Sequence, residues 1–145
     1  MANTLVITTT TPFDKMGEAM SADFDKLWQF MDDKKDMISG NPFSQYHKWQ
    51  MGKGQAQYAA GVPVKEIPAN LPAGIEAGEM APTKTYSVVH TGPYEHLGNA
   101  WSMMMNLQRA KSFPKKKYHP FEEYLNDPGT TDPMELKTAI RFGTK

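Results

Sequence analysis

The sequence of 145 residues contains no cysteine. This absence excludes disulfide bonds, thiolate metal sites and a cysteine nucleophile. No apolar run approaches the ~18 residues that a membrane span requires. The first residues, MANTLVITTTTP, also lack the basic and apolar regions of a signal peptide. We therefore expect a cytoplasmic protein without a membrane segment.

The chain also lacks an excess of charge, since Lys and Arg together number 16 and Asp and Glu together number 16. A nucleic-acid-binding protein normally carries a basic face. The basic run Lys115 to Lys117 is more typical of a solvated turn than of a phosphate-binding patch. The sequence therefore predicts that neither DNA nor RNA is a partner.

Motifs for metals, phosphates and nucleophilic catalysis are missing. The four histidines show no metal-ligand spacing, so we expect no metal site. The sequence has no Gly-rich phosphate loop and no G-x-S-x-G elbow. We predict no cofactor, and haem binding is disfavoured because no histidine has a clear inward position. Nothing in the residues alone indicates an enzyme.

Aromatic residues and methionine are abundant, with three Trp, six Tyr, seven Phe and eleven Met. Side chains of these types fill ordinary cores, and they also line flexible apolar pockets. Composition leaves both interpretations open. The same choice between core and pocket stays open for Trp28, Trp49 and Trp101.

Two stretches of the chain are nearly the same. TTPFDKMGEAM, residues 10–20, aligns without a gap with TGPYEHLGNAW, residues 91–101, at an offset of 81. NPFSQY, residues 41–46, aligns with HPFEEY, residues 119–124, at an offset of 78. Two matched blocks in the same order indicate an internal duplication.

Each copy reads as a strand, a helix and two further strands. The β-branched segments 5–9 and 86–90 predict the first strand of each copy. In the first copy Thr11 and Pro12 resemble a cap and a first helical residue. An apolar stripe follows at helical spacing, formed by Met16, Met20, Phe24, Leu27 and Met31.

The later strands are marked by turn residues and alternation. Residues 43–51 and 55–64 flank a Gly-Lys-Gly hairpin signal. Residues 118–126 and 136–142 form the corresponding pair, and a short edge strand is predicted over 74–80. The predicted fold is therefore α+β, a tandem βαββ duplication in which two helices cover one face of an antiparallel sheet.

We predict a single domain over residues 1–145. The first pseudo-repeat spans 4–64, a linker rich in Pro, Gly and Ala spans 65–83, and the second pseudo-repeat spans 84–142. A pseudo-twofold arrangement would leave a groove where the halves meet.

The copies differ at an acidic position. Glu122 and Tyr124 are two residues apart on a strand, so they share a face that Glu123 does not. An inward Glu122 would be costly unless paired or protonated, and it would suit a cationic or electrophilic ligand. Alternatively, both carboxylates are surface charges that pair across strands with Arg141 or Lys137. The residues alone leave both interpretations open.

Three segments together resemble one known family. They are Y-x-x-x-H-T-G-P-Y-E-H-L from residue 86, F-E-x-Y-L-N-D-P from residue 121, and T-T-D-P-x-E-L-x-T-x-I from residue 130. They are similar to the GyrI-like family of small-molecule-binding domains, which also forms effector-binding parts of bacterial regulators. The resemblance is close over residues 84–142 and implies the tandem βαββ fold.

The resemblance implies a site as well. In the family an acidic residue on the strand that precedes N-D-P lies in an aromatic cavity and meets cationic ligands, and the matching residue is Glu122. Four aromatic residues are carried over as cavity-lining candidates: Tyr46, Tyr86, Trp101 and Tyr124. Where relatives often read T-E-I-Y, this chain has Arg141 in place of the aromatic. An inward Arg141 would neutralise Glu122, whereas an outward one would leave the cavity more apolar.

Three functions follow from the resemblance. The leading hypothesis is a stand-alone protein that captures amphipathic or cationic aromatic compounds. The alternative is a hydrolase that opens electrophilic cyclopropane-type natural products with Glu122 and Tyr124. The third is a protein-binding role such as gyrase inhibition, which neutral charge does not support. Because no helix-turn-helix segment precedes the domain, we do not expect a transcription factor.

Overall fold

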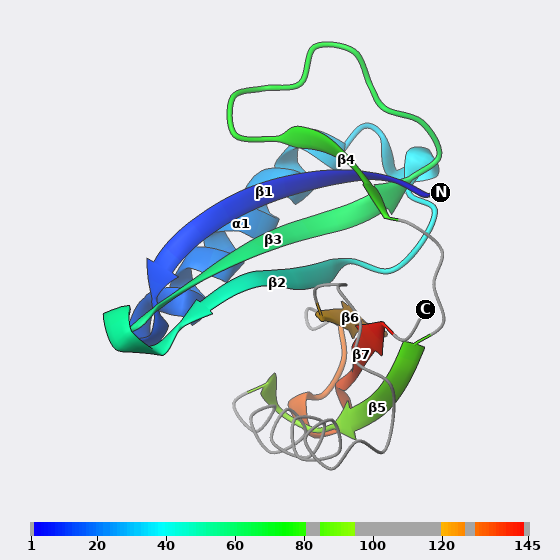
Figure 1. Ribbon diagram of the computed structural model, residues 1–145. Helices are drawn as coiled ribbons and strands as arrows, with labels where there is room; N and C mark the ends of the chain where they lie inside the picture. The colour runs from blue at the N-terminus through cyan, green and yellow to red at the C-terminus, as the bar shows by residue number, and fades with distance from the viewer. Residues whose placement is uncertain (1, 81–84, 95–119, 127–129, 144–145) are drawn as a thin grey trace. The chain divides into compact units, whose positions relative to one another are not determined.

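The computed structural model describes residues 2–80, 85–94, 120–126 and 130–143 (Figure 1). Over these ranges the chain forms seven strands and one α-helix. The predicted α+β class is therefore confirmed. The chain divides into two compact units, unit 1 (Met1–Pro82) and unit 2 (Thr83–Lys145).

Unit 1 is an antiparallel sheet with a helix on one face (Figure 1). Its elements are β1 (Ala2–Pro12), α1 (Met16–Met31), β2 (Phe43–Gln50), β3 (Gln55–Val64) and β4 (Glu76–Met80). The strands lie in the order β4-β1-β3-β2, and every neighbouring pair is antiparallel. The predicted hairpin and the predicted edge strand are both present.

The predicted start of the first helix is wrong by about one turn. Thr11 and Pro12 belong to β1, where they pair with Ala56 and Gln55. A 3-10 turn over Phe13–Lys15 follows before α1 begins, and no side chain caps it. The physical reason is that proline suits the end of a strand as well as the start of a helix, since in both places its missing N–H is not needed.

The core of unit 1 lies between α1 and the sheet. Leu27 and Met31 of the predicted stripe are fully buried, and Phe24 packs against them. Leucine and isoleucine side chains from β1 and valines from β3 face the helix, because alternate residues of a strand share a face. The buried cluster comprises Leu5, Ile7, Leu27, Met31, Val62, Val64 and Ile75.

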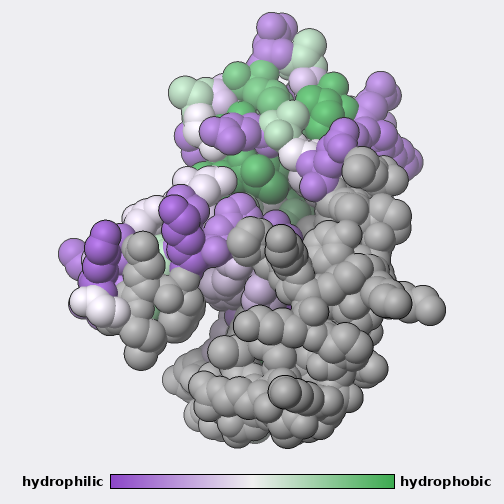
Figure 2. All heavy atoms as spheres, viewed as in Figure 1, coloured by the Kyte–Doolittle hydropathy of each residue, from purple (hydrophilic) through white to green (hydrophobic). Residues whose placement is uncertain are grey.

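The segment between β3 and β4 closes one end of this core. Leu71 packs against the core and Ile67 remains exposed. Figure 2 shows apolar residues gathered over this end of unit 1, at the top of the view.

On α1, Trp28 is 39% exposed, so it is not a core residue. The side chain of Trp49 and all of Trp101 lie outside the described part of the structure.

Unit 2 contains a three-stranded antiparallel sheet. Its strands are β5 (Thr85–Thr91), β6 (Phe121–Tyr124) and β7 (Lys137–Gly143), and β7 lies between the other two. A 3-10 turn over Pro133–Glu135 precedes β7, and the Asp132 carboxylate accepts a hydrogen bond from the Met134 amide at 2.9 Å. The second predicted helix falls within residues 95–119, which lie outside the described residues.

The two units repeat one pattern of strand pairing. In unit 1 the first strand pairs with the third, which pairs with the second, and β5, β7 and β6 do the same in unit 2. The registers match as well, so that four positions correspond between the units: Thr9 with His90, Ser44 with Glu122, Tyr46 with Tyr124, and Tyr58 with Thr138. The bounds predicted for the pseudo-repeats and linker stay predictions.

Candidate ligand-binding site

Strand β6 carries one buried carboxylate. Along its four residues burial alternates, so that Glu122 is 4% exposed and Tyr124 is 8% exposed, while Phe121 and Glu123 are half-buried. The Tyr124 hydroxyl donates a hydrogen bond to Glu122 Oε2 at 3.0 Å. The carboxylate and phenol that the sequence placed on one face of the strand are therefore in direct contact.

Arg141 lies on the other face of this sheet. In the β6–β7 ladder Arg141 is opposite Phe121, whereas Glu122 is opposite Ile140. The Arg141 Nε donates to Glu123 Oε1 at 3.0 Å, and both side chains are half-buried. The interpretation of a cross-strand ion pair thus holds for Glu123. The face that carries Glu122 is separated by the sheet from this arginine.

Tyr94 adds a second aromatic ring to the site. Its ring centroid lies 5.6 Å from that of Tyr124, and the two planes are inclined at 56°. This tilted contact is a favourable arrangement for aromatic pairs. Sequence reasoning missed Tyr94, although the residue lies within the repeated phrase, because nothing in the phrase shows which of its side chains meets β6.

Thr138 is the buried hydroxyl of the same face. It lies on β7 directly opposite Tyr124 on one side and His90 on the other. Its side chain is fully buried, and within the described ranges Oγ1 has no hydrogen-bond partner. The half-buried His90 is held differently, since its Nε2 lies 3.3 Å from the carbonyl oxygen of Pro93, to which it can donate. Neither residue was selected from the sequence.

In unit 1 the residues at the corresponding positions form hydrogen bonds to α1. The hydroxyls of Tyr58 and Thr9 both donate to Asp23 Oδ2 of α1, at 2.6 Å and 2.7 Å. Burial raises the pKa of Tyr58 well above its ordinary value of 10.0, and the hydrogen bond to Asp23 adds to the shift. In the position of Glu122, unit 1 has Ser44, whose hydroxyl lies 3.2 Å from Met20 Sδ. Of these two positions, only the one in unit 2 carries an acid.

The other predicted site residues are less fully described. Tyr46 is half-buried in unit 1, opposite Tyr58 in the β2–β3 ladder and thus on the face that carries α1. Tyr86 is opposite Phe142 in the β5–β7 ladder, and its side chain lies outside the described part of the structure. Trp101 lies outside the described residues altogether. Their roles in the site stay predictions.

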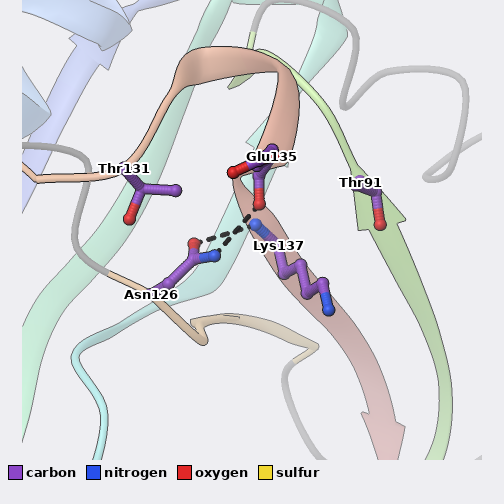
Figure 3. Close-up of a pocket in the computed structure, with 5 residues that line it drawn as sticks. All are labelled: Thr91, Asn126, Thr131, Glu135 and Lys137. Atoms are coloured by element: carbon purple, nitrogen blue, oxygen red, sulfur yellow. Dashed lines mark hydrogen bonds between the residues drawn. The ribbon is translucent and has the colours of Figure 1, made fainter.

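A separate hollow of about 320 Å³ lies at the turn end of unit 2 (Figure 3). The Asn126 side chain accepts a hydrogen bond from the Lys137 amide at 2.9 Å and donates one to the Glu135 carbonyl at 3.0 Å (Figure 3). Both polar atoms of Asn126 are thus used to hold the loop, which accounts for the asparagine in the L-N-D-P segment. The remaining lining residues, Thr91 and Thr131, are small and polar.

Among the residues that the structure describes, no three His, Asp or Glu side chains are grouped so that they could hold a metal ion. In the same ranges, no helix combines the length and hydropathy needed to cross a membrane.

The chain matches the family model of the GyrI-like small molecule binding domain over residues 3–144. It belongs to the GyrI-like family. The predicted resemblance is therefore confirmed, and the match extends over both units. No curated protein matches this GyrI-like chain in sequence.

Solved structures with the same fold include a DNA complex, a ligand complex and a hydrolase. The EcmrR–DNA complex is 17% identical with a TM-score of 0.83, and the similarity covers 98% of this chain and 53% of that chain. SAV2435 bound to tetraphenylphosphonium is 16% identical with a TM-score of 0.66, covering 100% and 90%. A hydrolase from Listeria innocua is 12% identical with a TM-score of 0.60, covering 99% and 87%. The GyrI-like chain thus spans about half the length of the EcmrR chain, and these likenesses concern the fold.

Proposed function

We propose that this GyrI-like protein binds amphipathic aromatic cations at Glu122, with the rings of Tyr124 and Tyr94 as apolar contacts. The observation that carries the proposal is the buried Glu122 carboxylate, 4% exposed and hydrogen-bonded to Tyr124. A carboxylate in a site of low dielectric attracts a cation far more strongly than one in water does. Aromatic faces add a cation–π attraction and accept ligands of varied shape.

One of the similar solved structures supports the charge preference. Tetraphenylphosphonium, the ligand in the SAV2435 structure, is a permanently charged cation surrounded by four phenyl rings. Its chemistry matches an acidic residue among aromatic rings. Because Arg141 is engaged with Glu123 on the other face, this arginine does not compete with a cation for Glu122.

The test uses two ligands of the same shape. One is (naphthylmethyl)trimethylammonium, and the other is its uncharged isostere, in which carbon replaces the nitrogen. At a separation of ~6 Å and an effective dielectric constant of ~20, the attraction between the cation and Glu122 is about 3 kcal/mol. Desolvation offsets part of this attraction. We therefore expect Glu122→Gln to weaken the cation by at least about tenfold and the neutral isostere by less than about twofold.

The chain offers a matched control in the next residue. Glu123→Gln removes the same charge one position along, from the face on which Glu123 pairs with Arg141. In titrations followed by naphthalene fluorescence, we expect Glu122→Gln to bind the cation more weakly than the wild type and Glu123→Gln do. Equal losses in the two variants, or equal losses for the two ligands, would contradict the proposal.

A hydrolase is the second candidate, and the contact between Tyr124 and Glu122 favours it. A carboxylate can orient or activate water, while a tyrosine hydroxyl can stabilise a developing oxyanion. The hydroxyl and carboxylate are already 3.0 Å apart. Incubation with a cyclopropane-bearing alkylator decides between the candidates, since more than one equivalent of ring-opened product per protein means turnover.

A protein-facing role such as gyrase inhibition, the cytoplasmic location and the absence of a nucleic-acid partner stay predictions of the sequence.

A further inference from the structure

We propose that Thr138 makes this site selective for cations that carry N–H groups, such as primary ammonium compounds, over quaternary cations. The inference rests on the proposed function, because it adds a second polar contact to a ligand held at Glu122. Thr138 would be a specificity-determining residue. It receives a hydrogen bond from the ligand that a quaternary cation cannot donate.

The first observation is the state of the Thr138 hydroxyl. The side chain is 0% exposed, and Oγ1 has no hydrogen-bond partner within the described ranges of the chain. Buried hydroxyls are nearly always satisfied in proteins, since an unsatisfied one destabilises the fold. Such a group is therefore expected where a ligand supplies the missing partner.

The second observation is the position of Thr138 relative to the carboxylate. In the β6–β7 ladder Thr138 is opposite Tyr124, and Ile140 is opposite Glu122, so Thr138 and Glu122 are diagonal neighbours on one face. Diagonal neighbours across an antiparallel pair are ~7 Å apart, and directly opposite residues are ~5 Å apart. One ammonium group between them can donate one hydrogen to Glu122 and another to Thr138.

The third observation comes from the duplication. The position that corresponds to Thr138 in unit 1 is Tyr58, whose hydroxyl donates to Asp23 of α1. The neighbouring Thr9 hydroxyl donates to the same carboxylate. In unit 1 the hydroxyls of Tyr58 and Thr9 therefore both have a hydrogen-bond partner within the protein. In unit 2 the position of Tyr58 is taken by the shorter Thr138, which is a diagonal neighbour of Glu122.

The binding test compares two probes that differ in their N–H groups, (naphthylmethyl)ammonium and (naphthylmethyl)trimethylammonium. Thr138→Val replaces the hydroxyl by a methyl group and keeps the shape of the side chain. We expect this variant to weaken the primary ammonium about fivefold, which corresponds to one hydrogen bond, and to change the quaternary probe by less than about twofold. Equal effects on both probes, or none on either, would overturn the inference.

Thermal stability provides a second, independent readout. If the hydroxyl lacks a partner in the free protein, Thr138→Val should raise the melting temperature by roughly 2–8 °C. Thr9→Val is the matched control, because the Thr9 hydroxyl is bonded to Asp23 at 2.7 Å and its loss should lower the melting temperature. A decrease with Thr138→Val would mean that the protein itself uses the hydroxyl, and the inference would fail.

Cation binding at Glu122 and selectivity through Thr138 can be tested separately. A wild-type protein that binds neither probe would contradict the proposed function, and the selectivity with it. A wild-type protein that binds both probes, and whose Glu122→Gln variant loses them, would keep the proposed function. In that case a Thr138→Val variant without discrimination would overturn the selectivity alone.

Discussion

Replacement of Tyr58 by phenylalanine tests how unit 1 joins its helix to its sheet. The substitution removes only the hydroxyl that donates to Asp23 Oδ2 at 2.6 Å, from a side chain that is fully buried. A hydrogen bond to a charged group contributes about 1.5–3 kcal/mol. Because Asp23 keeps the bond from Thr9 at 2.7 Å, we expect the low end, a loss of about 1.5–2 kcal/mol. For a chain of this size this loss lowers the melting temperature by roughly 3–8 °C.

The assay is thermal and urea unfolding at pH 7, followed by circular dichroism, for the wild type, Tyr58→Phe, Asp23→Asn and the double variant. Residues that share a hydrogen bond should show a coupling energy of about 1 kcal/mol or more in this cycle. A melting temperature within about 1 °C of the wild type, or strictly additive effects, would mean that this contact does not hold α1 to β3.

Tyr58→Phe should also differ from the wild type in how its stability changes at alkaline pH. Burial and the bond to Asp23 raise the pKa of Tyr58 in the folded state above its ordinary value of 10.0. The stabilising contribution of the neutral phenol is therefore complete below about pH 10 and is lost as the pH rises further. The wild type should lose stability above pH 10 more steeply than Tyr58→Phe does. Parallel stability curves for the two proteins in this range would contradict the expected shift.

Three further substitutions probe packing and charge. Gly61→Ala should destabilise by about 1–3 kcal/mol in urea unfolding, because its Cβ would lie 2.8 Å from the Leu5 carbonyl oxygen. Gly17→Ala is the opposite case, since nothing lies within 4 Å of its Cβ, and it should stabilise by up to about 1 kcal/mol as a residue of α1. Arg141→Ala should cost about 1 kcal/mol of stability, yet leave fluorescence titrations of a cation at Glu122 unchanged. Loss of cation binding in that variant would show that the two faces are not independent.

Local patterns predicted most of the strands. The β-branched segments, the Gly-Lys-Gly turn and the alternation in β7 each depend on neighbours in sequence, so they were readable without a structure. The start of α1 was not, because Thr11 and Pro12 fit both a strand end and a helix start. Cross-strand pairing decided between these two, and such pairing is not visible in one short stretch of sequence.

The candidate site was only partly predictable, for a related reason. The spacing of Glu122 and Tyr124 showed that they share a face, but not whether that face is buried. The same holds for Thr138 and Tyr94, whose importance depends on the register between β6 and β7 and on contacts between distant segments. Family resemblance pointed to the acid. The burial of Thr138, and the lack of a partner for its hydroxyl within the described residues, pointed to the threonine.

A crystal structure of the protein with tetraphenylphosphonium would show directly whether Glu122 holds the cation. We expect the phosphonium to lie closer to Glu122 than to any other carboxylate, with a phenyl ring against Tyr124 or Tyr94. We also expect the cation to have a clearly lower occupancy in Glu122→Gln crystals prepared in the same way. A cation bound instead in the hollow beside Lys137, or bound equally by the variant, would mean that Glu122 is not the cation site.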